Sequence, residues 1–184
     1  NKNEEAVKIW KWFREISLKE FNRVYDMLDI HFDSYNGESF YSDMLPGVIK
    51  EIRDKNLLEE SEGAEIINLE KYDLPPAIIV KSDGTSIYLT RDIAAAKYRE
   101  ENYKPDQIIY VVATQQSLHF KQLRAVLKEM GEDFWDKINH VAFGMVSLED
   151  GTLSTRRGKV VYLEDVLNKA TDKVREILDV REEK

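Results

Sequence analysis

The opening part of the chain alternates apolar and polar residues with the period of an α-helix. Apolar side chains recur at helical spacing across residues 4–29, and Ser17 followed by Glu20 forms a capping box. That pair predicts that one helix ends and another begins near residue 17. A further amphipathic helix is predicted over residues 42–56, where Pro46 is tolerated because it falls in the first turns.

The middle of the chain carries short apolar runs that are typical of strands. The runs at residues 64–69 and 77–81 are separated by two prolines. The turn at residues 82–84 (Ser-Asp-Gly) then leads into residues 85–89, in which polar and apolar residues alternate. A β-hairpin is therefore predicted across this turn.

From residue 90 onward, helices and strands alternate. The predicted order is helix, strand, helix, strand and helix, over residues 91–101, 107–113, 117–131, 140–146 and 163–182. Thr90 and Ser117 are placed to cap the first two of these helices. Short connections between a strand, a helix and the next strand imply a right-handed crossover, so the two strands are expected to pair in parallel. The sequence therefore predicts an α/β fold with part of a doubly wound sheet.

Polar clusters follow the predicted strands of this sheet. They lie at residues 88–92, at residues 114–119 and in the loop after Val146. Ligands of doubly wound sheets bind beyond the carboxyl ends of the strands. The three clusters are therefore expected to meet at one edge of the sheet and to form a site.

Asp92 has two interpretations. It is expected in the first turn of its helix, where a carboxylate complements the helix dipole, and the spacing alone favours that role. A carboxylate at a sheet edge also suits a guanidinium ligand, which offers paired donors in one plane. Tyr88, four residues earlier, would then add a phenolic hydroxyl.

The other two clusters also allow a structural and a functional interpretation. Gln116 and His119 are three residues apart, so both lie on one face of a helix start. His119 is either a helix-surface histidine or a donor to a nucleotide phosphate. Residues 153–159 (Leu-Ser-Thr-Arg-Arg-Gly-Lys) are either a solvated turn or a mobile loop that closes over a triphosphate. The spacing of a P-loop is absent.

Composition narrows the classes of function. With 27 basic and 35 acidic residues, the chain has a formal net charge of −8, so its overall field does not attract nucleic acid. It has no cysteine and only three, widely separated, histidines, which excludes disulfides and argues against a metal site. No apolar run is long enough to span a membrane, and a cytoplasmic protein is expected.

Three segments resemble the arginyl-tRNA synthetase family, in the same order and spacing. They are residues 83–99 (DGTSIYLTRDIAAAKYR), residues 109–124 (IYVVATQQSLHFKQLR) and residues 140–163, which contain Phe-Gly-Met-Val and Ser-Thr-Arg-Arg-Gly. Residues 9–69 resemble, more weakly, the connective insertion of that family's catalytic domain. The resemblance implies a class I synthetase, which activates arginine with ATP and transfers it to tRNA.

The resemblance also implies a domain organisation. The fold would be the C-terminal half of a Rossmann-like catalytic domain, with part of a connective insertion on its N-terminal side. Residues 1–82 would belong to the insertion, residues 83–162 to the nucleotide-binding fold, and residues 163–184 to a helix that leads toward an anticodon-binding domain. A monomer is expected.

Site residues follow by position in the family's motifs. Tyr88, Asp92 and Gln116 would bind arginine. His119, Met145 and Val146 would bind ATP, which is expected to arrive with Mg²⁺. The loop residues Ser154, Arg156 and Arg157 would act in catalysis, and the tRNA acceptor end would be the partner. No metal ligands are expected in the chain itself.

Two departures from the family pattern qualify this hypothesis. Thr155 stands where the class motif Lys-Met-Ser-Lys-Ser has its second lysine, so the charge is expected from Arg156, Arg157 or a lysine elsewhere. The His-Ile-Gly-His element is absent from the sequence. The chain is therefore expected to be a fragment that is inactive alone. The alternatives are another class I-type nucleotidyl transferase or synthetase, and a non-catalytic binding module derived from a synthetase.

Overall fold

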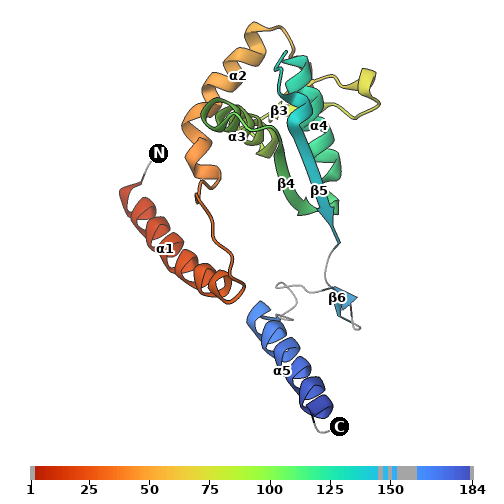
Figure 1. The fold of residues 1–184 in the computed structure, drawn as a ribbon. Coiled ribbons are helices and arrows are strands. Elements are labelled where there is room, and N and C mark those ends of the chain that lie inside the picture. Colours follow the sequence, from red (N-terminus) through yellow and green to blue (C-terminus); the bar gives the residue numbers. More distant parts are fainter. Residues whose placement is uncertain (1–2, 145–146, 149–150, 153–160, 183–184) are drawn as a thin grey trace. The chain divides into compact units, whose positions relative to one another are not determined.

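The computed structural model describes residues 3–144, 147–148, 151–152 and 161–182. Figure 1 shows the helices and strands of the chain. The chain divides into two compact units, one of residues Asn36–Met145 and one that joins Asn1–Tyr35 to Val146–Lys184. The helices are α1 (Glu4–Met27), α2 (Leu45–Asp54), α3 (Tyr88–Tyr103), α4 (Ser117–Glu129) and α5 (Leu163–Glu182). The strands are β1 (Glu59–Ser61), β2 (Ala64–Ile67), β3 (Ala77–Val80), β4 (Ile108–Ala113), β5 (Ile138–Phe143), β6 (Ser147–Leu148) and β7 (Gly151–Thr152).

Helix α1 runs without a break, so the capping box predicted at Ser17 is wrong. The actual cap is Asn3, whose side-chain oxygen accepts hydrogen bonds from the backbone N–H of Glu5 at 3.0 Å and of Ala6 at 3.3 Å. Glu20 does not reach back to Ser17, because its carboxylate pairs with the Arg23 guanidinium one turn later at 2.7 Å. Without that second bond, the good helix formers around Ser17 continue the helix.

The predicted helix over residues 42–56 is confirmed as α2, with Pro46 in its first turn. A 3₁₀ helix, Glu38–Met44, precedes it. The predicted strands at 64–69 and 77–81 are confirmed as β2 and β3, which pair antiparallel. Strand β1, which the sequence did not reveal, completes this sheet in the order β1-β2-β3.

The strand predicted over residues 85–89 is wrong, because helix α3 already begins at Tyr88. Only one isolated bridge, between Val80 and Ser86, remains of the expected hairpin. Thr90 is not the cap but the third residue of the helix, and it is fully buried. Its hydroxyl donates a hydrogen bond to the carbonyl oxygen of Ile79 at 2.7 Å, which ties the start of α3 to strand β3. Ser117 is likewise the first residue of α4 and not its cap.

The predicted parallel pair is confirmed. Strands β4 and β5 run side by side in Figure 1, and their register joins Ile108 to Ile138 at one end and Ala113 to Phe143 at the other. The core of the Asn36–Met145 unit contains fully buried residues from its two sheets and from its helices. Among them are Ile52, Ile79, Ile93, Leu123 and Ile138. The helix predicted over 163–182 is confirmed as α5. Among the described residues, no helix is both long and apolar enough to cross a membrane.

Candidate functional site

Asp92 lies beyond the first turn of its helix. Because α3 begins at Tyr88, Asp92 is the fifth helical residue, and the first turn contains no acidic residue. The influence of the helix dipole fades within the first turn. The dipole interpretation, which the spacing had favoured, is therefore wrong, because it rested on a helix start placed three residues too late.

The carboxylate of Asp92 contacts His119. Its Oδ2 atom lies 2.6 Å from Nε2 of the imidazole, and the side chains of His119 and Asp92 are 19% and 33% exposed. The His119 ring also meets the ring of Phe120 edge to face at 5.2 Å. Sequence reasoning placed these two side chains in different parts of the site, one with arginine and one with ATP. The structure brings them into direct contact.

Sequence reasoning missed two further residues, Tyr110 and Arg99, of which Tyr110 senses the charge of Asp92. The Tyr110 hydroxyl accepts a hydrogen bond from the Arg99 guanidinium at 2.8 Å. Burial raises the pKa of Tyr110 to about 12, and the negative charge of Asp92 adds to the rise while Arg99 opposes it. Tyr110 therefore stays protonated at neutral pH. The one signal in the sequence was a hydroxyl within an otherwise apolar strand.

Tyr88 and Gln116 flank the pair as exposed side chains. Tyr88 is 67% exposed and lies one helical turn before Asp92, so both point to the same side of α3. Gln116 is exposed at the end of the 3₁₀ turn Thr114–Gln116 and lies three residues before His119. The contact between Asp92 and His119 therefore brings the 88–92 and 114–119 clusters together, as the sequence predicted for these two.

The carboxyl ends of the two parallel strands are tied together beside this site. The Thr114 hydroxyl, just after β4, donates a hydrogen bond to the carbonyl oxygen of Phe143, the last residue of β5, at 3.0 Å. Below it, His140 Nε2 lies 2.8 Å from the carbonyl oxygen of Val112. The His140 ring stacks on Phe120 at 4.5 Å. The site is thus built on a rigid strand end, where doubly wound sheets bind their ligands.

The third predicted cluster is outside the part of the chain that the structure describes. This holds for the expected catalytic residues Ser154, Arg156 and Arg157 and for the expected ATP-binding residues Met145 and Val146. Within the described residues, no group of three or more acidic or histidine side chains is arranged to hold a metal ion. What the described site offers is a carboxylate, an imidazole, a phenol and an amide.

Comparisons with known sequences agree over nearly the whole chain. The family model for the catalytic domain of class I tRNA synthetases (R) matches residues 1–184. The arginine–tRNA ligase of Halothermothrix orenii is 60% identical over 179 residues, which are 97% of this chain and 32% of that protein. That of Clostridioides difficile is 58% identical over 178 residues, covering 97% of this chain and 31% of that protein. The chain thus spans about a third of the length of these relatives.

The fold has a solved counterpart. The crystal structure of arginyl-tRNA synthetase from Plasmodium falciparum matches with a TM-score of 0.83 and 30% sequence identity. The match covers 100% of this chain and 30% of that one. The fold of this chain therefore matches a part of that larger protein.

Proposed function

This chain belongs to the catalytic-domain family of class I arginyl-tRNA synthetases, and from that membership we propose that it contributes the arginine pocket of an arginine–tRNA ligase. In the proposed reaction, the carboxylate of arginine displaces pyrophosphate from ATP to form arginyl-adenylate. A hydroxyl at the acceptor end of tRNA then displaces AMP. Because the chain spans about a third of its curated relatives, the remaining parts of the reaction site would lie elsewhere in the full-length protein.

Asp92 supports the arginine assignment. It is a half-buried carboxylate at the carboxyl edge of a parallel sheet, and its Oδ2 faces His119. Among the described residues, Oδ1 accepts no hydrogen bond, so this oxygen can receive a guanidinium N–H. In a partly desolvated site such a charge-assisted bond is stronger than in water. Tyr88 and Gln116 would supply a hydroxyl and an amide around the same substrate.

A second set of residues would bind ATP. His119, Met145 and Val146 would contact the nucleotide. Arg156 and Arg157 would neutralise its phosphates during displacement, and the Ser154 hydroxyl would donate a hydrogen bond to them. Mg²⁺ would arrive bound to ATP and would offset phosphate charge; the chain's own contribution would be to orient the nucleotide. His119 would then serve both substrates, because its imidazole already contacts the carboxylate assigned to arginine.

The experiment that tests the proposal replaces Asp92 in the full-length protein. Asp92→Asn removes the charge and nearly preserves the shape. Removing one partner of a buried charge pair costs about 2–5 kcal/mol, so kcat/KM for arginine should fall by roughly 30-fold to several thousand-fold. The KM for ATP should change much less.

Asp106→Asn is the matched control. Asp106 is exposed and has no ion pair among the described residues, so its replacement removes the same charge without touching the site. If Asp92→Asn leaves the kinetics with arginine as close to the parent as Asp106→Asn does, Asp92 does not bind the substrate.

A further inference from the structure

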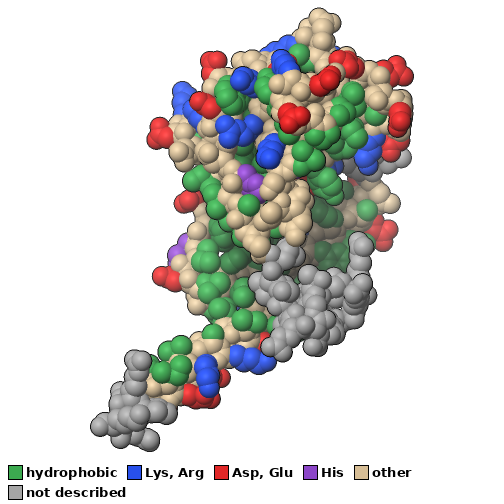
Figure 2. Space-filling model, turned by 90° about the vertical axis from the view of Figure 1, so that its right-hand side faces the viewer, with side chains coloured by type: hydrophobic (Ala, Val, Ile, Leu, Met, Phe, Trp, Pro, Cys, Tyr) green, Lys and Arg blue, Asp and Glu red, His purple; other side chains and the backbone are tan. Residues whose placement is uncertain are grey.

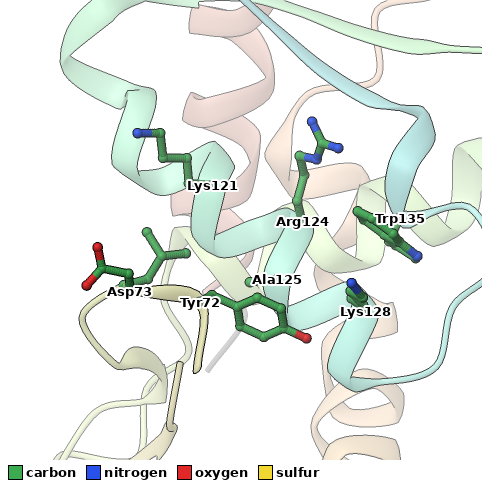
Figure 3. A pocket seen from close by; sticks show the side chains of 8 residues that line it. Tyr72, Asp73, Lys121, Arg124, Ala125, Lys128 and Trp135 are labelled. Carbon is green, nitrogen blue, oxygen red and sulfur yellow. The ribbon is translucent and has the colours of Figure 1, made fainter. Parts of the chain in front are cut away.

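Helix α4 carries a row of cations on the face that borders a cleft. Lys121, Arg124 and Lys128 recur at intervals of three and four residues, so they lie on one side of the helix. They line a cleft of about 460 Å³ together with Tyr72, Asp73, Leu74, Ala125 and Trp135 (Figure 3). The cleft concentrates three positive charges and one carboxylate in a chain whose formal net charge is −8. None of the residues assigned to arginine or ATP lines it.

Aromatic faces, and not carboxylates, hold two of these cations in place. The Lys128 ammonium nitrogen lies 4.4 Å from the centre of the Trp135 ring and 5.7 Å from that of Tyr72. The Arg124 guanidinium carbon lies 5.6 Å from the same Trp135 ring, and Figure 3 shows both cations beside it. A cation–π contact orients a cation without neutralising its charge, so its N–H groups can still donate to an anionic ligand. In the described part of the chain, none of the three α4 cations forms an ion pair.

Glu129, which follows Lys128 on α4, is already paired with another cation. Glu129 pairs with Lys71 at 2.6 Å and also accepts a hydrogen bond from the Tyr72 hydroxyl. Burial raises the pKa of Glu129, but the contacts from Lys71 and Tyr72 outweigh burial and hold it below its usual value. The carboxylate is thus engaged with Lys71, and Asp73 is the one acidic residue that lines the cleft.

Hydrogen bonds hold the two walls of the cleft, α4 and the 72–76 segment, against each other. The Gln122 amide of α4 donates hydrogen bonds to the carbonyl oxygens of Pro75 and Pro76 at 3.0 and 3.2 Å, which fastens the 72–76 segment against the helix. The bond between Tyr72 and Glu129 fastens the same segment one helical turn from Ala125. A volume of about 460 Å³ lies within the range typical of small-ligand sites. Positioned cations and rigid walls lower the cost of ordering a ligand.

We propose that this cleft is a phosphate-binding site, which takes a ligand carrying more than one phosphate group. The Arg124 fork suits two oxygens of one phosphate, and Lys121 and Lys128 reach neighbouring phosphates as point charges. The half-buried rings of Tyr72 and Trp135 line the same cleft and offer apolar surface to a base. Two sources share this chemistry, a free polyphosphate and the backbone of a single-stranded RNA.

The test uses the full-length protein and a double variant, Arg124→Gln with Lys128→Gln. The probes are inorganic tripolyphosphate and an oligouridylate of about 8 nucleotides, with binding measured by calorimetry across a range of salt concentrations. The double variant should bind at least one probe about tenfold more weakly or worse, because it removes two charged donors that would contact phosphate. For RNA, the salt slope should also fall by about 1.4, which is about 0.7 for each lost phosphate contact.

The matched control removes two charges elsewhere, as Lys81→Gln with Lys104→Gln, both of which are exposed. It should bind like the parent. Loss of tripolyphosphate binding would identify a small polyphosphate ligand, and loss confined to the oligouridylate would identify an RNA backbone. Equal binding by the parent and the double variant would overturn the proposal. It would also be overturned if the double variant lost affinity for a polyglutamate peptide, an anion without phosphate, to the same degree as for RNA.

Two readouts keep this result separate from folding and from the ligase activity. The double variant should still unfold in one cooperative urea transition, with a midpoint lowered only by the loss of its cation–π contacts. A third variant, Lys121→Gln, weakens the same face without touching the cation–π contacts and should show a smaller loss of the same kind. Arginine-dependent pyrophosphate exchange should persist in all of these variants, so a failed ligase assay would count against the proposed function and not against the cleft.

Discussion

The contact between Asp92 and His119 could not be read from the sequence. The two residues are 27 positions apart. The sequence alone explained Asp92 by the helix dipole and His119 as a histidine on a helix surface. Only the packing of α3 beside α4 brings the carboxylate and the imidazole to 2.6 Å. Residue types and helical spacing did predict which side chains gather at this strand end. They did not predict which of them touch, nor that the buried Tyr110 bonds to Arg99.

A double-mutant cycle measures what this contact does. If Asp92 and His119 served arginine and ATP independently, the effects of Asp92→Asn and His119→Ala on kcat/KM would multiply. Residues in direct contact typically show coupling of about 0.5–3 kcal/mol, so we expect the double variant to differ from the product by roughly 2-fold to 150-fold. Steady-state kinetics of the full-length protein with each substrate checks this. Simple multiplication within error would mean that the two side chains act separately.

At the scale of elements, the sequence predicted the alternation of strands and helices but misplaced their starts. Helix α3 begins at Tyr88, where alternation had suggested a strand. The cause is tertiary: Leu89 and Thr90 are buried, and the Thr90 hydroxyl bonds to strand β3. The capping box at Ser17 failed for a local reason, because Glu20 found a better partner in Arg23.

The bond between Thr90 and Ile79 gives a prediction for the junction of α3 and β3. Thr90→Val keeps the shape and removes the hydroxyl, which leaves a buried carbonyl oxygen without its donor. The free energy of unfolding should fall by about 1–3 kcal/mol. Thr90→Ser keeps the hydroxyl and loses one methyl group, which should cost about 1 kcal/mol. Urea unfolding of both variants decides the matter, and a valine variant as stable as the parent would show that this bond contributes little.

A second junction predicts acid sensitivity. Lys97 of α3 pairs with Glu51 of α2 at 3.0 Å and also with Glu132. Burial raises the pKa of Glu51, but hydrogen bonds from Lys97 and Lys55 outweigh it, so the pKa lies below its usual value. A carboxyl whose pKa is lower in the folded than in the unfolded state adds stability above the unfolded pKa. That stability is lost as pH falls from about 4.3 through the folded pKa.

Lys97→Met should therefore lower stability at pH 7 and flatten its decline in acid. The loss at pH 7 should be about 1–3 kcal/mol, because two partly buried carboxylates lose a charged donor. Lys50→Met is the control, since Lys50 and Asp54 form a pair that is largely exposed to solvent. Urea midpoints at pH 7 and pH 3.5 measure both effects. If stability falls between pH 7 and pH 3.5 as steeply in Lys97→Met as in Lys50→Met, the pairing with Lys97 is not the source of the acid sensitivity.

At the scale of the whole molecule, much of the apolar surface remains uncovered. One face of the parallel pair exposes Ile109, Val111, Val141 and Phe143, each by about half or more, and α1 exposes Trp12 and Phe13 by more than half. Figure 2 shows apolar side chains reaching the surface on the face it presents. Parallel sheets are normally covered on both faces. The sequence of 107–113 is apolar on both sides, as in a strand that is buried on both faces, yet in this chain one of those faces is exposed.

The domain division predicted at residues 82 and 162 remains a prediction. Contacts within the chain instead group Asn36–Met145 as one unit and join Asn1–Tyr35 to Val146–Lys184 as the other. Within the second unit, Arg23 of α1 pairs with Glu164 of α5 at 2.6 Å, across 141 residues of sequence. Periodicity and motif spacing are local signals, so they do not reveal such a long-range pairing.

The most direct test of the account compares arginine with citrulline in ATP–pyrophosphate exchange by the full-length protein. Citrulline has nearly the shape of arginine but carries a neutral urea group in place of the guanidinium, so it cannot form a charge pair with the Asp92 carboxylate. We predict exchange with arginine, little or none with citrulline, and none with either by the isolated 184-residue chain, which lacks the His-Ile-Gly-His element. Exchange supported equally by citrulline, or better by another amino acid than by arginine, would contradict the account.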